Sequence, residues 1–264
     1  MHLITALDGR RKVIIAPRDP TPYVVLSARK PIGRNTGTTI GGRRVANRTK
    51  RLADRFRTYR KSLRTDLSTP ANRRRALAYQ RWMDHGFLRL FWTNMHRIAP
   101  DVWRSNHPTP RRFARLSAMG IRTIVSLRGS GTAPWALLEQ EACAAAGITF
   151  ETVALKSRAA APKAELQKLI ALFRRVEKPL LIHCKSGADR AGLASAIYLL
   201  VIEKRPLAEA RRMLSLRYVH LKWTKTGVLD LLLDQFEASA VPDFEVWLAD
   251  HYDAAALQSA FTEV

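Results

Sequence analysis

The chain has 264 residues, 47% of them hydrophobic, which is enough for one domain with a core plus an extension. Its two cysteines, Cys143 and Cys184, argue against a disulfide-built secreted fold and for a reducing compartment. No apolar run is long enough to cross a bilayer and the N-terminus has no apolar signal core, so we expect neither a transmembrane segment nor a signal peptide.

The formal net charge of +23 is concentrated at the front of the chain. Residues 1–92 hold 22 Lys and Arg against 5 Asp and Glu, a net +17, which leaves +6 for the rest. Such an excess attracts polyanions such as nucleic acid, anionic lipid headgroups or polyphosphate. The alternative is a solvated basic extension without a partner, and both interpretations stay open. We interpret residues 1–80 as a partly irregular basic extension with two strand-like runs, 12–16 and 23–27, and little stable packing.

A different pattern follows over residues 81–96. Large apolar side chains recur there at roughly helical spacing, with arginines between them: Trp82, Phe87, Leu88, Phe91, Trp92 and Met95. A basic aromatic helix of this kind can lie on a membrane surface. We favour the other interpretation, in which the stripe packs against the following domain.

From residue 110 onward, helices and strands alternate. The predicted helices are 110–119, 135–146, 161–176, 191–203, 207–216, 223–238 and 241–261, and the predicted strands are 121–127, 148–155 and 179–182. This alternation predicts an α/β fold with a central, mainly parallel sheet flanked by helices. We assign residues 81–240 to one catalytic domain and 241–264 to a C-terminal helix.

The loop between the strand 179–182 and the helix 191–203 has the composition of an anion site. Cys184 and Arg190 are its ends, and Gly187 in the middle permits a backbone conformation closed to residues with a side chain. Backbone N–H groups at a helix start can form a cup for an anion, and the same field favours the thiolate form of Cys184. The planar guanidinium of Arg190 matches two phosphate oxygens. A nucleophile, an anion cradle and a bidentate cation therefore converge on one phosphoryl group.

At His183-Cys-Lys-Ser-Gly-Ala-Asp-Arg190 the chain resembles the Cys-x5-Arg phosphatases, the superfamily of protein tyrosine and dual-specificity phosphatases. The resemblance covers about residues 94–238, and the segments 104–105 and 120–128 resemble the opening of small bacterial and fungal dual-specificity-like members. A buried cysteine beside a helix-starting arginine, or a rhodanese-type loop, is the alternative interpretation.

The resemblance implies a phosphatase-like fold and a cytoplasmic, metal-independent enzyme without a cofactor. Cys184 would attack phosphorus and form a cysteinyl-phosphate, while Arg190 and the loop amides hold the oxygens. His183 would hydrogen-bond backbone near the nucleophile and tune it, or serve structure alone.

The chain departs from the family pattern at two places. Most relatives carry an aspartic general acid on a mobile loop after a strand, but residues 153–162 contain no carboxylate. Asp189, inside the loop, is the best local substitute, unless it only braces the loop or Arg190. Ala191 stands where many relatives have Ser or Thr, which predicts slow turnover of the phosphocysteine. Ser186 or Ser195 could compensate.

Several residues are candidates for binding the substrate: Lys185, Ser186, Gly187 and Ala188 in the loop, and Lys156, Arg158 and Arg128 near it. The expected substrates are phosphotyrosine, phosphoserine or phosphothreonine of proteins, or a phosphoinositide or inositol phosphate. The alternatives are an RNA 5′-phosphatase of the same superfamily, with the basic front end holding RNA, and a phosphate-binding module without catalysis.

Overall fold

The structure is a computed structural model that describes residues 54–55, 58, 67–84, 86–129, 131 and 133–263. The chain divides into two units, Met1–Arg51 and Leu52–Val264, and all of these residues belong to the second. Its strands are β1 (His96–Ala99), β2 (Val102–Ser105), β3 (Thr123–Ser126), β4 (Thr149–Thr152) and β5 (Leu180–His183). Its α-helices are α2 (Pro70–Ala78), α3 (Pro110–Ala118), α4 (Pro134–Ala145), α5 (Lys163–Arg175), α6 (Asp189–Val201), α7 (Leu207–Arg211), α8 (Val228–Ala238), α9 (Phe244–Asp250) and α10 (Ala254–Thr262). The short elements are a π-helical turn η1 (Tyr79–Met83) and the 3-10 turns η2 (Leu88–Leu90), η3 (Leu216–Tyr218) and η4 (Lys225–Gly227).

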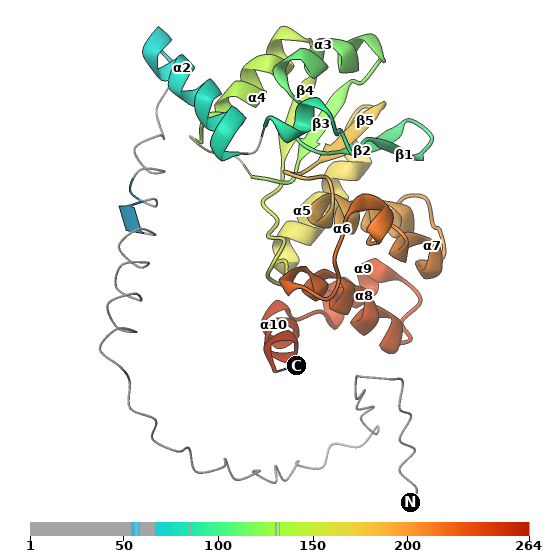
Figure 1. Cartoon of the computed structure of the whole chain (residues 1–264). Helices are drawn as coiled ribbons and strands as arrows, with labels where there is room; N and C mark the ends of the chain where they lie inside the picture. The colour runs from blue at the N-terminus through green and yellow to red at the C-terminus, as the bar shows by residue number, and fades with distance from the viewer. Residues whose placement is uncertain are drawn as a thin grey trace, which may run out of the picture. The chain divides into compact units, whose positions relative to one another are not determined.

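The five strands form one sheet in the order β1-β2-β5-β3-β4, with helices on both sides (Figure 1). β5 is the central strand and pairs in parallel with β2 and β3, β3 pairs in parallel with β4, and β1 alone is antiparallel. The predicted mainly parallel α/β sheet is therefore confirmed. Because the parallel strands end at the same edge, the residues that follow β5 meet those that follow β2 and β3.

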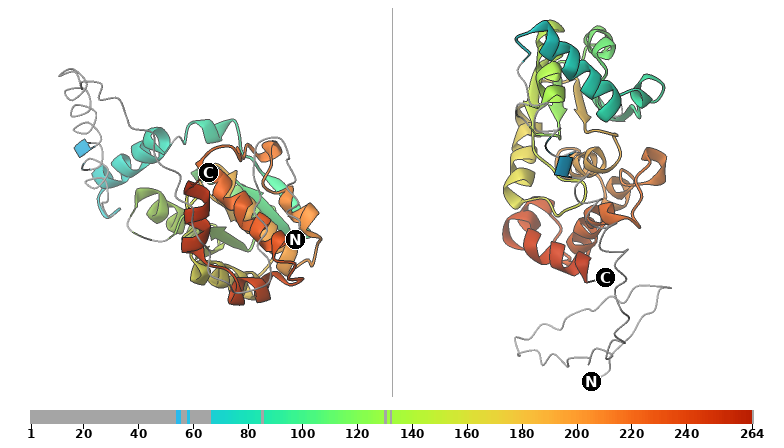
Figure 2. Two further views of the ribbon diagram at one scale, coloured as in Figure 1. Left: turned by 90° about the horizontal axis from the view of Figure 1, so that it is seen from below. Right: turned by 60° about the vertical axis from the view of Figure 1, so that its left-hand side comes forward.

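The two faces of the sheet are covered by different helices. Ile124 and Leu181 pack with side chains of α3 and α4, whereas Val125, Leu180 and Ile182 pack with those of α5, α6 and α8. Alternate residues of a strand point to opposite faces, so short apolar strands serve both layers. Figures 1 and 2 show the C-terminal helices α8, α9 and α10 gathered on the α5–α6 side, away from α3 and α4.

The prediction of a single helix over residues 241–261 is wrong, because two helices occupy this segment. Asp243 and Asp253 each accept hydrogen bonds from two following backbone N–H groups, and so cap the N-termini of α9 and α10. An aspartate that bonds local backbone favours a helix start over a helix interior. Between the two helices, the Tyr252 hydroxyl donates to the Ala161 carbonyl at 2.6 Å and anchors the break.

The aromatic stripe at the front of the domain is also corrected. Trp82 is 60% exposed and Phe91 is 91% exposed, so these rings do not form the expected apolar staple. Gln80, Asp84 and Arg89 point inward instead and are buried. Of the stripe, Met95 packs against the apolar cluster on the α3–α4 side, while most of the segment joins the domain through polar and charged contacts. The segment leads into the hairpin of β1 and β2, which sequence patterns did not indicate.

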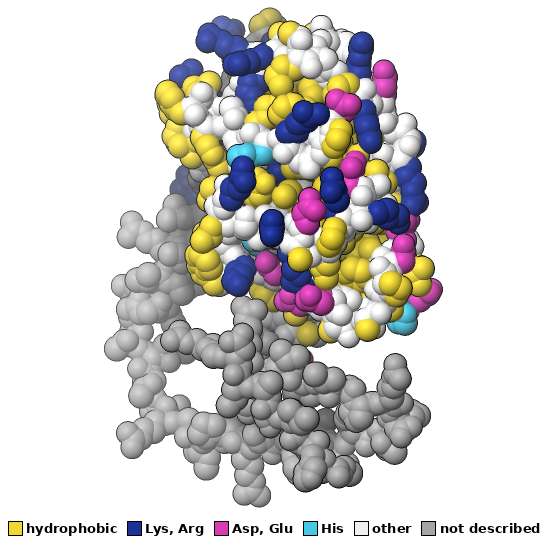
Figure 3. Space-filling model, turned by 90° about the vertical axis from the view of Figure 1, so that its right-hand side faces the viewer, with side chains coloured by type: hydrophobic (Ala, Val, Ile, Leu, Met, Phe, Trp, Pro, Cys, Tyr) yellow, Lys and Arg dark blue, Asp and Glu magenta, His cyan; other side chains and the backbone are white. Residues whose placement is uncertain are grey.

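The strand-like runs 12–16 and 23–27 and most of the basic segment 1–80 lie outside the described residues. On the face drawn in Figure 3, Lys and Arg side chains are scattered over the surface and Asp and Glu side chains lie among them. This mixture agrees with the small net charge of residues 93–264. In the described part of the chain, no helix combines the length and apolar character that spanning a bilayer requires.

Candidate active site

The loop from Cys184 to Arg190 joins the central strand β5 to the buried helix α6. Cys184 follows β5 directly, its side chain is buried, and its Sγ accepts a hydrogen bond from the Gly187 amide at 3.3 Å. The Ala188 amide donates to Ser186 Oγ at 3.4 Å. The loop therefore turns a backbone N–H toward the sulfur at the N-terminus of a helix, where negative charge is favoured.

Gly187 is required at its position for two reasons. Its φ of +75° lies in the left-handed region that L-residues with a side chain rarely adopt. A Cβ would also lie 2.6 Å from the Asn106 amide nitrogen and 2.7 Å from the Ser105 carbonyl carbon. The loop can pass this close to the end of β2 only because residue 187 has no side chain.

Arg104 fixes the loop from behind, a role that sequence reasoning missed. Its Nη2 donates to the carbonyls of Gly187 and Ala188 at 2.7 and 2.9 Å, and its Nη1 donates to Met213 at 2.7 Å. The guanidinium is fully buried and lies 3.9 Å from the centre of the Tyr218 ring. Burial lowers the pKa of Arg104 to about 10, which still leaves it charged near neutral pH.

His183, the last residue of β5, belongs to a buried polar network with Glu139 and His107. Its Nε2 lies 2.5 Å from Glu139 Oε1, and its Nδ1 lies 3.3 Å from the Cys184 carbonyl oxygen. His107 Nδ1 lies 3.5 Å from Glu139 Oε2, and burial followed by nearby arginines holds the pKa of His107 well below its ordinary value. His183 Nδ1 thus contacts the backbone of Cys184, while its role in tuning the nucleophile stays a prediction.

The trio of His107, Glu139 and His183 also bears on metal binding. It is the only trio in the described part of the chain whose ligand atoms lie within 4.8 Å of one another. All three side chains are fully buried, and His183 Nε2 and Glu139 Oε1 lie 2.5 Å apart, in the alignment of an ion pair without a well-directed hydrogen bond. Two ligands of a tetrahedral zinc, each about 2 Å from the ion, stand farther apart. We interpret the trio as a polar core network.

Asp84 gathers three cations beside the start of the loop. Arg128 forms a two-pronged ion pair with it at 2.8 and 2.9 Å, Arg89 lies at 2.5 Å and Lys185 Nζ at 3.5 Å. Arg128 also stacks on Trp135 at 3.8 Å. Burial raises the pKa of Asp84, but the cations outweigh it and hold that pKa below its ordinary value. Asp84 is therefore a fixed anion and cannot donate a proton near neutral pH.

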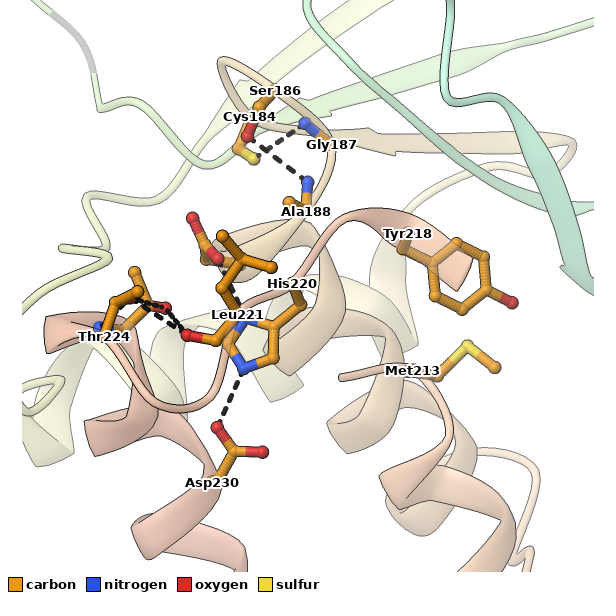
Figure 4. A network of polar contacts seen from close by, with 12 residues as sticks. Cys184, Ser186, Gly187, Ala188, Met213, Tyr218, His220, Leu221, Thr224 and Asp230 are labelled. Carbon is orange, nitrogen blue, oxygen red and sulfur yellow. Dashed lines mark hydrogen bonds and ion pairs between the residues drawn. The ribbon is translucent and has the colours of Figure 1, made fainter. Parts of the chain in front are cut away.

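Asp189 stands at the other end of the loop and contacts His220. Its Oδ1 lies 2.8 Å from His220 Nδ1, and His220 Nε2 lies 2.8 Å from Asp230 Oδ2. Figure 4 shows the His220 ring directed toward Asp230, beneath the loop that carries Cys184 and Gly187. Neither His220 nor Asp230 has a sequence signal that marks it, because both meet Asp189 only through the fold.

The other predicted site residues lie around this loop. Arg190 is half-buried and its Nη1 donates to the Leu127 carbonyl at 3.4 Å, at the end of β3. Lys156 and Arg158 are exposed, and Arg158 lines a pocket of about 350 Å³ together with Asp189. Ala191 is buried, and Ser195 donates to its carbonyl at 2.6 Å inside α6, so Ser195 serves the helix. The substrate-binding roles of these residues stay predictions.

The second cysteine has no part in the site. Cys143 is fully buried in α4 among apolar side chains, and burial raises the pKa of its thiol to about 12. A thiol of this kind is inert at neutral pH.

Comparison with known families matches residues 103–225 to the model described as "PTP-SAK: Swiss Army Knife protein, DSP-PTPase phosphatase domain". Among curated proteins, the chain is similar to the dual specificity protein phosphatase TpbA of Pseudomonas aeruginosa, with 31% identity over 110 residues. The alignment covers 42% of this chain and 48% of TpbA, so the chain spans about half the length of the curated relative.

Solved structures give lower similarity. A putative phosphatase (DUF442) from Shewanella putrefaciens has a TM-score of 0.44 at 19% identity, covering 59% of this chain and 97% of that one. TpbA from P. aeruginosa has a TM-score of 0.40 at 22% identity, covering 64% and 91%. The signature loop, residues 183–190, lies within the stretch 103–225 that matches the phosphatase-domain model, and the similarity to TpbA points to the same kind of domain.

Proposed function

We propose that the chain is a metal-independent phosphatase that hydrolyses phosphomonoesters through a cysteinyl-phosphate on Cys184. The observation that carries this proposal is the position of the Cys184 sulfur, which follows the central strand and accepts the Gly187 amide at the start of α6. Its place within the matched residues 103–225 supports the same chemistry.

The proposed reaction has two steps. The Cys184 thiolate attacks phosphorus in line, and the bond to the leaving oxygen breaks as that oxygen gains a proton. Water then attacks the phosphocysteine and the thiolate leaves. The loop amides and Arg190 hold the equatorial oxygens, because preformed dipoles aimed at developing charge stabilise the transition state. We assign the general acid to Asp189, since Asp84 is held ionised by its cations.

The proposed substrates are phosphorylated proteins or phosphoinositides. Lys185 is 38% exposed at the loop, and Arg158 and Lys225 line the pocket beside Asp189, so cations face the place where an anionic group would enter. The name of TpbA, a dual specificity protein phosphatase, favours the protein substrates.

A substrate panel tests the proposal. The full chain, in buffer with EDTA, is assayed with p-nitrophenyl phosphate, phosphopeptides, inositol phosphates and triphosphate-ended RNA. We expect turnover that disappears in Cys184→Ser and persists in Cys143→Ala, which changes the inert thiol. Turnover unaffected by Cys184→Ser would overturn the proposal. Activity confined to RNA ends would favour the RNA 5′-phosphatase, and phosphate binding without turnover would favour a binding module.

The proposal extends to a cytoplasmic location and to a polyanion contact through the basic segment. A reducing compartment keeps the thiol of Cys184 free for the reaction. Removal of residues 1–66 is expected to weaken binding to heparin without changing turnover of p-nitrophenyl phosphate. Unchanged heparin binding would leave the segment without the proposed contact.

A further inference from the structure

His220 is held between two carboxylates next to the loop 184–190, which is called the phosphate loop below after its proposed role. Its Nδ1 lies 2.8 Å from Asp189 Oδ1 and its Nε2 lies 2.8 Å from Asp230 Oδ2. The ring is 2% exposed, whereas the side chains of Asp189 and Asp230 are 21% and 19% exposed. One buried imidazole thus links α6, whose first residue is Asp189, to α8, which carries Asp230.

The hydrogen bonds determine how many protons His220, Asp189 and Asp230 share. A neutral imidazole has one N–H, and its other nitrogen only accepts. Two carboxylates at hydrogen-bond distance from the two nitrogens therefore require one additional proton, on the imidazole or on a carboxyl group. Burial lowers the pKa of His220, but its hydrogen bonds to Asp189 and Asp230 outweigh burial and raise that pKa to about 9. The triad therefore holds this additional proton at neutral pH.

The backbone fixes His220 in place. Val219, immediately before it, has a φ of +63°, a conformation that β-branched residues rarely adopt. On either side of Val219, Tyr218 accepts a hydrogen bond from the Asn94 side chain, and the His220 amide donates to Ser215. Asn94 also donates to Ser186 in the phosphate loop at 3.1 Å, so one side chain ties the His220 segment to the loop.

Asp189 is the member of the triad that belongs to the loop 184–190. It precedes Arg190 in the signature and lines the pocket of about 350 Å³ with Arg158 and Lys225. The charged groups that face His220 are Asp189 from α6 and Asp230 from α8, and the two pocket cations lie beside Asp189. Of the two carboxylates that His220 contacts, Asp189 is the one in the loop, so a proton that leaves Nδ1 toward the site passes to Asp189.

We propose that Asp189, His220 and Asp230 form a proton relay that replaces the missing mobile-loop acid, with His220 as the positioning residue that supplies Asp189. This inference rests on the proposed phosphatase function. As the phosphorus–sulfur bond forms and the bond to the leaving oxygen breaks, the Nδ1 proton of His220 passes to Asp189 and from Asp189 to that oxygen. His220 is then neutral and keeps its Nε2 proton toward Asp230. When water attacks the phosphocysteine, the proton it releases returns to Asp189 and His220.

The relay predicts how the rate depends on the leaving group. The full chain is compared with His220→Gln, Asp230→Asn and Asp189→Asn on aryl phosphates of increasing leaving-group pKa. His220→Gln is expected to reduce kcat for phenyl phosphate about tenfold or more, and for p-nitrophenyl phosphate much less, because a good leaving group needs little protonation. Equal losses on both substrates would mean a structural role and would overturn the relay. Asp234→Asn, one turn further along α8 and paired with Arg211, is the matched control and should change neither rate.

The pH profile gives a second readout. The wild type should lose kcat for phenyl phosphate as pH rises through about 9, because the relay then loses its proton. Asp230→Asn removes one of the two carboxylates, so this alkaline loss should move to lower pH. If kcat of Asp230→Asn fell at the same alkaline pH as kcat of the wild type, the relay would be contradicted, even if His220→Gln failed to fold.

The stored proton can be observed without turnover. In the ¹⁵N NMR spectrum of the full chain labelled at histidine, the resonance absent from His220→Gln should show an imidazolium at pH 7.5. A neutral ring at that pH would overturn the relay and leave the Cys184 chemistry untouched. If the unmodified chain showed the imidazolium but turned over none of the substrates, the proposed function would be overturned instead.

Discussion

Two charge clusters lie at opposite ends of the phosphate loop and are built in opposite ways. At the Lys185 end, one buried carboxylate, Asp84, is surrounded by three cations. At the Asp189 end, one buried imidazole, His220, lies between two carboxylates. The first cluster has no proton to give, because its carboxylate is held ionised. The second has one proton in excess. The difference supports the proposal that acid chemistry belongs to the α6–α8 side of the loop, with anchoring on the Asp84 side.

The largest effect should come from the anchoring cluster. Asp84→Asn leaves Arg89 and Arg128, which are 4% and 7% exposed, without their carboxylate. Because unpaired buried charges are costly, we expect the free energy of unfolding to fall by about 3–5 kcal/mol in urea titrations. Asp234→Asn, which breaks a partly exposed pair with Arg211, should cost less than about 1 kcal/mol. Equal losses in both variants would contradict the assignment of Asp84 as an anchor.

The next effect separates the two carboxylates in catalysis. Asp189→Asn should lower kcat for phenyl phosphate about 100-fold and kcat for p-nitrophenyl phosphate far less, because a general acid matters most for poor leaving groups. Asp84→Asn, measured well below its unfolding midpoint, should lower both rates by the same factor. A leaving-group dependence in Asp84→Asn, or none in Asp189→Asn, would reverse the comparison.

The two clusters should also respond to pH in opposite directions. His220 has its pKa raised from 6.5 to about 9, so its stabilisation is complete below pH 6.5 and is lost as pH rises through 9. Asp84 has its pKa lowered from 3.8, so its stabilisation is present above that pH and is lost as pH falls further. Between pH 6 and pH 9 the free energy of unfolding of the wild type should fall by at most about 3 kcal/mol through His220, as measured by urea unfolding. His220→Gln should not show this fall. Equal pH dependence in wild type and variant would contradict this.

The smallest effect concerns Lys185. It is 38% exposed and 3.5 Å from Asp84, so Lys185→Gln should change stability by less than about 1 kcal/mol. If it also meets the substrate, KM for an anionic phosphopeptide should rise about two- to fivefold, and less at high salt. Lys204→Gln, an exposed lysine paired with Asp243, is the control and should leave KM unchanged. An unchanged KM in Lys185→Gln would restrict this lysine to the anchoring cluster.

The parts of the fold that follow local patterns could be predicted. The strand β5, the loop 184–190 and the helix α6 have continuous apolar runs on both sides of a glycine-containing signature, and the structure confirms their order. The hairpin β1–β2 could not be predicted, because its four-residue strands carry arginine and histidine, and β2 owes its place in the sheet to its pairing with β5, which is distant in sequence.

The candidate site could be predicted only where its residues are neighbours in sequence. Cys184, Asp189 and Arg190 share one loop, so the sequence alone brings them together as candidates. Arg104 and His220 reach that loop only through the fold, so no spacing rule indicates them. The aromatic stripe has the periodicity of a packed helix. In the structure, however, Asp84 is buried with three cations, Arg89, Arg128 and Lys185, and the polar side of the segment faces the domain.

The most direct test of the account is the chemical identity of the intermediate. The full chain is mixed with p-nitrophenyl phosphate, quenched in acid within milliseconds, and digested for mass spectrometry. The account predicts one phosphate on the peptide that carries Cys184, present also in Cys143→Ala and absent in Cys184→Ser. Phosphate on another residue, or turnover by Cys184→Ser at the wild-type rate, would contradict it.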